Sequence, residues 1–271
     1  MGNYIVLSVD LELFPDTLAF QKLNREWEYG ENGESGITRL LDLFDKYDVR
    51  STFFVVAKYA QSHNKLLQRI RNSGHEIASH TMAHINFKNR AYDEIEREIQ
   101  QSKQVLEKAI NDAVIGFRSP AFRINRRIAG AIMQADYKYD SSVVPSRSIP
   151  GWYGLPKAPK HSFNIREIFP GTDLDLMEFP VAVNPIISMP VSGAWMRLFG
   201  VSYTMWSIKA IMRQGGVPIL YVHPWEIVEL PRLKGIPWRV YHRTGEQTLN
   251  MIEHIIKHTH AEFVSIRELL K

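Results

Sequence analysis

Two histidines four residues apart, His80 and His84, are the residues whose type and spacing point most directly to chemistry. In a helical turn, this spacing places both imidazoles on one side, within reach of a single metal ion. Two histidines, one carboxylate and one open position form a common catalytic zinc site. The chain holds ten histidines, so such a pair also arises by chance, and the alternative is two polar loop residues.

Two carboxylates are placed to complete such a site. Asp10 and Glu12 follow directly on the apolar run 4–9, which predicts a buried strand. Residues i and i+2 of a strand point to the same side, so one acid could bind the metal while the other acts as a general base. The alternative is an acid pair that caps a helix or is solvated in a loop. Because the chain has no cysteine, its metal sites can use only histidine and carboxylate ligands.

These residues belong to a regular alternation of strand-like and helix-like segments. We expect strands at 4–9, 52–56, 75–79, 114–117, 219–222 and 262–265, and helices at 37–47, 64–72, 92–110 and around 249–256. This alternation predicts an α/β fold with a mainly parallel sheet. Four polar residues fall at or just after predicted strand ends, where α/β barrels carry their chemistry: Asp10, His80, Arg118 and His223.

Local signals mark the ends of some elements. Ser35 is a candidate N-cap for the first long helix, and Ser73-Gly74 is a candidate helix end. Residues 146–175 are rich in Pro, Gly and aromatic residues and show little periodicity, which is typical of a functional lid or a disordered loop. Because no repeat, low-complexity tract or linker divides the chain, we predict a single domain over residues 1–271.

Composition argues against several classes of protein. The net charge is +4, with basic residues interspersed among acids, which argues against a nucleic-acid binder. The longest apolar stretches are far shorter than the roughly 20 residues of a membrane span. The start of the chain lacks the features of a signal peptide, which predicts a cytoplasmic protein or a trimmed sequence. The apolar run 194–206 predicts core, and the alternative is a lid or a patch in transient contact with a membrane carrying a lipid-linked sugar.

Several motifs resemble those of one known family. Residues 74–84, Gly-His-Glu-Ile-Ala-Ser-His-Thr-Met-Ala-His, are similar to the signature of the polysaccharide deacetylase family, the NodB-homology proteins of carbohydrate esterase family 4. Residues 51–56 resemble its Thr-Phe-Phe strand, and residues 116–122 resemble its Arg-x-Pro motif. Segments 153–159, 178–180 and 221–226 are similar to a bacterial subgroup associated with exopolysaccharide biosynthesis.

The resemblance implies a distorted (β/α) barrel of about seven parallel strands. It implies a hydrolase that removes the N-acetyl group from an N-acetylhexosamine of a polysaccharide, or of its lipid- or nucleotide-linked precursor. It also implies a divalent metal cofactor, Zn²⁺ before Co²⁺, Ni²⁺ or Mn²⁺. His80 and His84 would be metal ligands, and a backbone N–H near Ala121 or Phe122 would stabilise the oxyanion.

The same resemblance assigns proton transfers to three further residues. Asp10 would be the general base that takes a proton from the attacking water, and Arg118 would pair with it. His223 would be the general acid that protonates the departing sugar amine. An amine leaves poorly unless it is protonated, so an acid opposite the base fits the chemistry, and histidine suits this role near neutral pH.

The sequence departs from the family at one position. The common motif has two adjacent acids after the first strand, but Leu11 stands at the second position and the acid follows as Glu12. Glu12 is therefore the candidate third ligand. If its side chain points away, a metal-independent hydrolase of cyclic amides or imides is the alternative. A catalytically inactive carbohydrate-binding relative is another, although the complete set of polar residues argues against it.

Several other polar residues have two interpretations each. His75 is expected to be packed or to lie in an outer shell rather than to bind metal. The acid that tunes His223 has four candidates, Asp173, Asp175, Glu178 and Glu226, and Glu226 could equally cap the next segment. Trp225 could line a sugar pocket or belong to the core.

Overall fold

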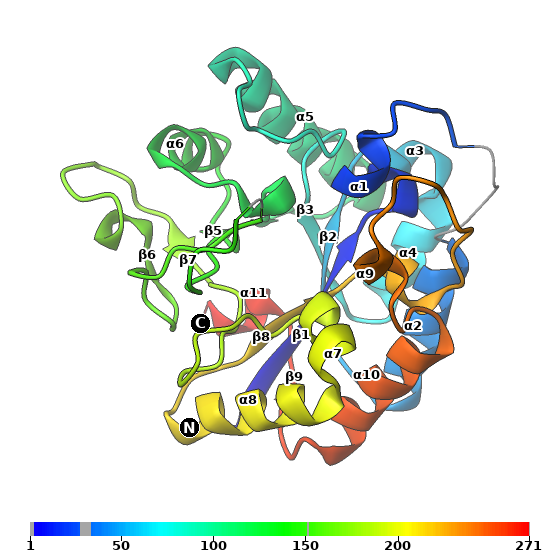
Figure 1. Ribbon diagram of the computed structural model, residues 1–271. Helices are drawn as coiled ribbons and strands as arrows, with labels where there is room; N and C mark the ends of the chain where they lie inside the picture. The colour runs from blue at the N-terminus through cyan, green and yellow to red at the C-terminus, as the bar shows by residue number, and fades with distance from the viewer. Residues whose placement is uncertain (1–2, 28–33, 151, 271) are drawn as a thin grey trace.

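The computed structural model describes residues 3–27, 34–150 and 152–270 of the chain. Within these ranges a nine-stranded sheet has the order β6-β7-β5-β4-β3-β2-β1-β8, and β9 pairs with β1 outside this path. Neighbouring strands from β7 to β8 are parallel, while β6 is antiparallel to β7. The sheet is curled into a half-barrel with helices around it (Figure 1), so the predicted α/β fold and distorted barrel are confirmed.

Each strand and helix that the sequence predicts has an observed counterpart, but half of the strands and α-helices in the described ranges were not predicted. The strands are β1 (Tyr4–Leu11), β2 (Thr52–Val55), β3 (Glu76–Ser79), β4 (Gly116–Phe117), β5 (Tyr139–Asp140), β6 (Phe163–Asn164), β7 (Met177–Glu178), β8 (Ile219–Val222) and β9 (Glu262–Phe263). The α-helices are α1 (Leu18–Gln21), α2 (Glu34–Lys46), α3 (Tyr59–Ser62), α4 (Asn64–Asn72), α5 (Tyr92–Ile110), α6 (Arg126–Gln134), α7 (Gly193–Phe199), α8 (Val201–Arg213), α9 (Trp238–Tyr241), α10 (Glu246–His258) and α11 (Ile266–Leu269). Short 3-10 turns are η1 (Phe14–Asp16), η2 (Pro120–Phe122), η3 (Ile165–Glu167) and η4 (Pro224–Ile227).

Two helix-end predictions have different outcomes. The end of α4 is confirmed, because Ser73 is its C-cap and Gly74 adopts φ +79°, a left-handed conformation that glycine takes without a steric penalty. The Ser35 N-cap is wrong, because Ser35 already lies inside α2. The strand predicted at 114–117 is also shorter, since only Gly116–Phe117 pairs with neighbours.

Strand alternation decides which side chains of β1 face the inside of the half-barrel. The odd-numbered residues from Ile5 to Leu11 pack into the main core, together with Leu40 and Phe44 of α2. The even-numbered residues therefore face the other way, and they become polar toward the carboxyl end of the strand: Ser8, Asp10 and, one residue beyond it, Glu12. Burial of the odd face thus fixes the direction of both acids.

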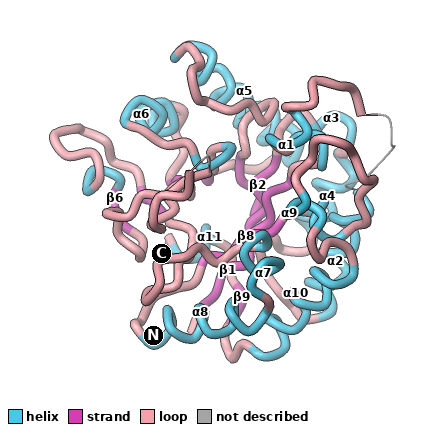
Figure 2. The backbone as a smooth tube through the Cα atoms, viewed as in Figure 1, coloured by secondary structure: helices cyan, strands magenta, loops and turns pink. Residues whose placement is uncertain are grey.

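The aperiodic segment 146–175, described except for residue 151, is packed against the sheet and contributes to the pocket described below. Figure 2 shows mostly loop backbone between α6 and α7, interrupted by short elements such as β6. Phe163, Ile165 and Leu174 are buried in the main core, which anchors the segment to the sheet. The apolar run 194–206 forms α7 and the first half of α8, with Trp195 buried but Trp206 exposed. No helix in the described ranges is both long and apolar enough to cross a membrane.

Candidate active site

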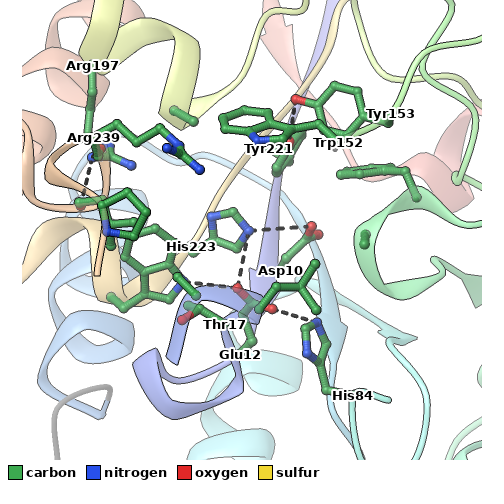
Figure 3. Close-up of a pocket in the computed structure, with 18 of the residues that line it drawn as sticks. Asp10, Glu12, Thr17, His84, Trp152, Tyr153, Arg197, Tyr221, His223 and Arg239 are labelled. Atoms are coloured by element: carbon green, nitrogen blue, oxygen red, sulfur yellow. Dashed lines mark hydrogen bonds and ion pairs between the residues drawn. The ribbon is translucent and has the colours of Figure 1, made fainter. Parts of the chain in front are cut away.

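A pocket of about 310 Å³ opens at the carboxyl end of β1. Asp10, Glu12, His80, His84 and His223 all line it. Figure 3 shows Asp10, Glu12, His84 and His223 pointing toward one another at its base. Residues from three separate strand ends thus converge in one cavity, as the rule for parallel barrels predicts.

Three buried side chains form a group whose composition suits a divalent cation. One ligand atom from each of Glu12, His80 and His84 lies within 4.8 Å of the others. The closest pair is Glu12 Oε2 and His84 Nε2, 2.6 Å apart. All three residues are at most 5% exposed. Two imidazoles and one carboxylate are the donor set of many catalytic zinc sites, so the residues present fit the metal that the resemblance implies.

The hydrogen bonds of the two histidines support this arrangement. His80 Nδ1 lies 2.7 Å from the carbonyl oxygen of Arg118, and His84 Nδ1 lies 2.9 Å from that of Asp16. A carbonyl oxygen only accepts, so Nδ1–H donates in both cases and Nε2 is the candidate ligand atom of each ring. Burial opposes the charged form of His84, but the carboxylate of Glu12 beside Nε2 raises the pKa of this imidazole. Burial lowers the pKa of His80 to about 4, which favours the neutral imidazole that metals require.

The prediction of a helical turn between the two histidines is wrong. Residues 80–84 are a loop, in which Thr81 has φ +67° and His84 has φ +56°. The carbonyl oxygens of Thr81 and Met82 accept hydrogen bonds from the N–H groups of Ala57 and Lys58 after β2, so they are not free for helical bonds. The rings still meet, with centroids 4.9 Å apart. A left-handed β-branched residue is strained, and such strain concentrates at functional sites.

Asp10 forms a fully buried ion pair with Arg118. Arg118 Nη1 donates to Asp10 Oδ1 at 2.6 Å and to Ser8 Oγ at 3.0 Å. The guanidinium also donates to the backbone and hydroxyl oxygens of Ser141, and it lies 3.9 Å from the centre of the Phe54 ring. These contacts hold one oxygen of Asp10 and leave Oδ2 facing His223, whose Nε2 is 4.0 Å away.

Glu226 is the acid that contacts His223. Its Oε2 accepts from the backbone N–H of His223 at 2.8 Å and lies 3.2 Å from Nδ1, so it both caps η4 and orients the ring. Arg197 completes this buried arrangement, with Nε 2.9 Å from Glu226 Oε1. The other three candidate acids do not contact His223 in the part of the chain that the structure describes: Asp173 and Asp175 are exposed, and Glu178 binds the N–H of Val143.

The charge balance around His223 favours its protonated form. Burial by itself would lower the pKa of the imidazole, but the carboxylates of Glu12, Glu226 and Asp10 together raise it to about 9. Burial likewise opposes the charged form of Glu12, yet His84 and His223 bring the pKa of that carboxyl well below its usual range. The pocket therefore places a cationic proton donor beside carboxylates without fully exposing either to solvent.

Trp225 is part of the pocket wall and also part of a buried hydrophobic cluster. It lines the pocket, its Nε1–H donates to Glu12 Oε1 at 3.0 Å, and its ring is stacked on His223 with centroids 5.0 Å apart. Ala121 and Phe122 line the opposite wall, both with φ +54°. The N–H of Phe122 already donates to Ser119, so Ala121 is the better candidate for an oxyanion donor.

His75 is packed and does not belong to the metal site. Its ring lies between Phe44 and Phe53, with centroids 5.7 and 5.1 Å away, and in the described structure neither ring nitrogen has a hydrogen-bond partner. Burial lowers the pKa of this imidazole to about 4. Between pH 6.5 and 4 the unfolded chain therefore binds a proton that the folded chain does not, and stability decreases as the pH falls through this window.

This linkage predicts the effect of His75→Leu on stability. From pH 7.5 to pH 5 the wild-type protein should lose about 2 kcal/mol of unfolding free energy more than the variant loses. Urea denaturation at the two pH values measures this difference. His260→Leu, at an exposed histidine, is the control and should keep the wild-type dependence on pH. An equal loss in wild type and His75→Leu would contradict the assignment.

Some residues in and beside the pocket could not be found from the sequence. Asp16 holds His84 through its backbone oxygen, while its carboxylate accepts from Lys58 and Tyr59. A backbone contact of this kind leaves no sequence signal. Trp152 and Tyr153 also line the pocket, and they lie in the aperiodic segment, where no periodicity indicated their direction. Only the resemblance of residues 153–159 to a known subgroup included Tyr153.

Two family models match successive parts of the chain. Residues 26–139 match the polysaccharide deacetylase family, and residues 141–271 match a domain family of unknown function. His80, His84 and Arg118 thus lie in the first match and His223 in the second, although one sheet includes strands from both. Asp10 and Glu12 precede the first match.

Three named relatives share short stretches with the chain. A peptidoglycan-N-acetylglucosamine deacetylase of Bacillus cereus is 30% identical over 100 residues, covering 37% of this chain and 46% of the relative. A peptidoglycan deacetylase of Helicobacter pylori is 23% identical, covering 55% and 53%. A chitooligosaccharide deacetylase of Sinorhizobium fredii is 30% identical, covering 28% and 35%. The chain thus spans about half or less of these relatives.

Solved structures show the same fold over the whole chain. A Mycobacterium smegmatis protein, assigned as a candidate polysaccharide deacetylase, superposes with a TM-score of 0.67 at 19% identity, covering 99% of this chain and 89% of that one. A CE4 family pseudoenzyme from Bacillus anthracis superposes with a TM-score of 0.56 at 14% identity, covering 100% and 66%. The half-barrel of this chain therefore has the fold of these structures. Residues 26–139 thus match the polysaccharide deacetylase family, and the fold of the whole chain is that of these solved structures.

Proposed function

We propose that the chain removes the N-acetyl group from an N-acetylhexosamine unit of a polysaccharide or of its lipid- or nucleotide-linked precursor. The observation that carries this proposal is the convergence, in one pocket, of a metal-type donor triad, a paired carboxylate and an oriented histidine. The names of the relatives support an acetylated sugar as the substrate. We also propose that residues 1–271 form one catalytic domain, since β8 of the second matched region pairs with β1.

Glu12, His80 and His84 would hold a divalent cation, for which zinc is our first choice because the donors are two imidazoles and one carboxylate. When bound, such a cation polarises an amide carbonyl and lowers the pKa of water beside it. Backbone carbonyls orient both imidazoles through Nδ1, so Nε2 of each ring would be the atom that binds the ion.

Asp10 and His223, at the base of the pocket, would carry out the two proton transfers. Asp10 Oδ2 takes a proton from the attacking water as the new C–O bond forms, while Arg118 holds Oδ1. The N–H of Ala121 would donate to the oxyanion. His223 Nε2, with its ring fixed by Glu226 and Trp225, gives a proton to the sugar nitrogen as the C–N bond breaks. The products are acetate and a free amine.

Acetate release before and after chelation tests this function. We expect the purified protein to release acetate from N-acetylated oligosaccharides, to lose at least about 99% of this activity after exhaustive chelation, and to regain it with zinc or cobalt. Full activity after verified metal removal would favour the cyclic-amide alternative instead. Sugar binding without acetate release at any metal content would favour an inactive carbohydrate-binding protein.

A further inference from the structure

An unbroken series of aromatic rings leads away from the pocket along α7 and α8. We define this aromatic series as Trp152, Trp195, Phe199, Tyr203 and Trp206. The centroids of successive rings are 5.6, 5.6, 5.2 and 6.4 Å apart. The first ring, Trp152, lines the pocket, and the last, Trp206, is 42% exposed. The series therefore connects the active-site cavity with the protein surface.

The spacing along the two helices explains how the series arises. Trp195 and Phe199 are four residues apart in α7, and Tyr203 and Trp206 are three apart in α8, so each pair shares a helix face. Gly200 joins the helices with φ +86°, a conformation that glycine takes without strain. The aromatic series therefore continues from α7 into α8.

Hydrogen bonds hold the buried members of the series in place. Trp195 Nε1–H donates to Tyr153 Oη at 3.0 Å, and the hydroxyl of Tyr203 lies 3.0 Å from the carbonyl oxygens of both Met189 and Pro190. Four large apolar side chains are exposed in the described part of the chain, and two of them, Phe199 at 53% and Trp206, belong to the series. Core packing does not account for these two rings, and a ligand that reaches them meets a rigid surface.

We propose that the aromatic series is an extended binding surface for a polysaccharide, along which sugar units beyond the one being deacetylated stack on the exposed rings. This inference rests on the proposed function for its substrate class. The support for this inference is that the aromatic series begins in the wall of the pocket. A polysaccharide that places one sugar unit at Glu12 and His223 passes Trp152 as it leaves the pocket. Aromatic rings offer an apolar face to such a ligand while requiring little loss of side-chain entropy.

A membrane is the other class of ligand that exposed aromatic rings attract, but the charges do not favour it. Membrane-binding helices carry clusters of Lys and Arg beside their apolar residues. In α7 and α8, Arg197 is buried against Glu226, and the exposed cations are Lys209 and Arg213. Arg213 is the last residue of α8, far along the chain from Phe199.

Binding of short and long oligosaccharides to the zinc-loaded full chain tests the inference. Asp10→Asn serves as the background in every sample, so that the ligand is not consumed. We expect N-acetylglucosamine hexamers to bind more tightly than dimers, and the Phe199→Ala/Trp206→Ala double substitution to weaken hexamer binding about tenfold and dimer binding much less. Ile186→Ala removes a more exposed apolar side chain outside the series and should leave the ratio of the two affinities unchanged.

The outcomes separate this inference from the proposed function. Equal affinities for dimer and hexamer, or a ratio that the double substitution does not alter, would overturn the aromatic series as a sugar surface even if acetate release is normal. Absence of acetate release, with a chain-length preference that depends on the two rings, would overturn the catalytic proposal alone. Binding to phosphatidylglycerol vesicles that is lost in the double variant, without a change in hexamer binding, would identify a lipid surface instead. If the double variant does not fold by circular dichroism, Trp206→Ala alone is compared.

Discussion

Asp10→Asn is expected to lower kcat for acetate release by roughly 10²- to 10⁴-fold, because the amide cannot accept the proton that the carboxylate takes from water. The change preserves size and leaves Arg118 hydrogen-bonded to Ser8 and Ser141. Steady-state kinetics with an N-acetylated oligosaccharide measures the effect. Asp175→Asn, which removes an exposed acid paired with Arg166, is the matched control and should keep wild-type activity.

Loss of activity in Asp10→Asn must be separated from loss of the fold. Removing one partner of a buried ion pair costs about 3–5 kcal/mol, so the melting temperature should fall. Circular dichroism and zinc titration at a temperature well below the transition establish that the site is still formed. An Asp10→Asn protein that is folded, binds zinc and retains wild-type kcat would rule out Asp10 as the general base.

Glu12→Gln is expected to weaken zinc binding by more than the roughly 10- to 100-fold that loss of an outer-shell partner costs. Glutamine keeps the oxygen that accepts from Trp225 Nε1, but it removes the negative charge that lies beside His84. Competition with a chromophoric zinc chelator gives the affinity directly, independently of catalysis. Glu262→Gln, at an exposed acid paired with Arg50, is the control.

Unchanged zinc affinity or unchanged activity in Glu12→Gln would contradict the assignment of Glu12 as the third ligand. Wild-type zinc affinity together with wild-type activity would mean that the third ligand is another group and that the departure from the family motif at Leu11 is functionally silent. Wild-type activity in a variant that binds no zinc would point to the metal-independent alternative.

The direction of the acids could be predicted from the sequence because it depends on a local rule. Apolar residues at the odd positions of β1 fix which face is buried against the helices, so Asp10 and Glu12 must lie on the other face. The strand β8 and the helices α4 and α5 were predicted with their observed bounds for the same reason, since each has a clear periodicity. The rim position of His223 followed directly from the end of β8.

Contacts between distant segments could not be predicted in this way. Residues 80–84 form a loop because the N–H groups of Ala57 and Lys58, which follow β2, donate hydrogen bonds to carbonyl oxygens of this segment. These contacts between distant segments, and not the helical spacing of the two histidines, determine the conformation. Glu226 was only one of four candidate acids, because its selection depends on Arg197, 29 residues away, whose burial has no local signal. The aromatic series likewise forms only when the aperiodic segment brings Trp152 against α7.

The central claim is that Glu12, His80 and His84 bind one catalytic metal ion. An anomalous difference map from crystals of the zinc-loaded protein, measured on both sides of the zinc absorption edge, tests it most directly. We expect a single strong peak in the pocket at roughly 2.0–2.2 Å from Nε2 of both histidines and from a carboxylate oxygen of Glu12. A peak at another place, or none in protein that is active and contains no metal by elemental analysis, would contradict the claim.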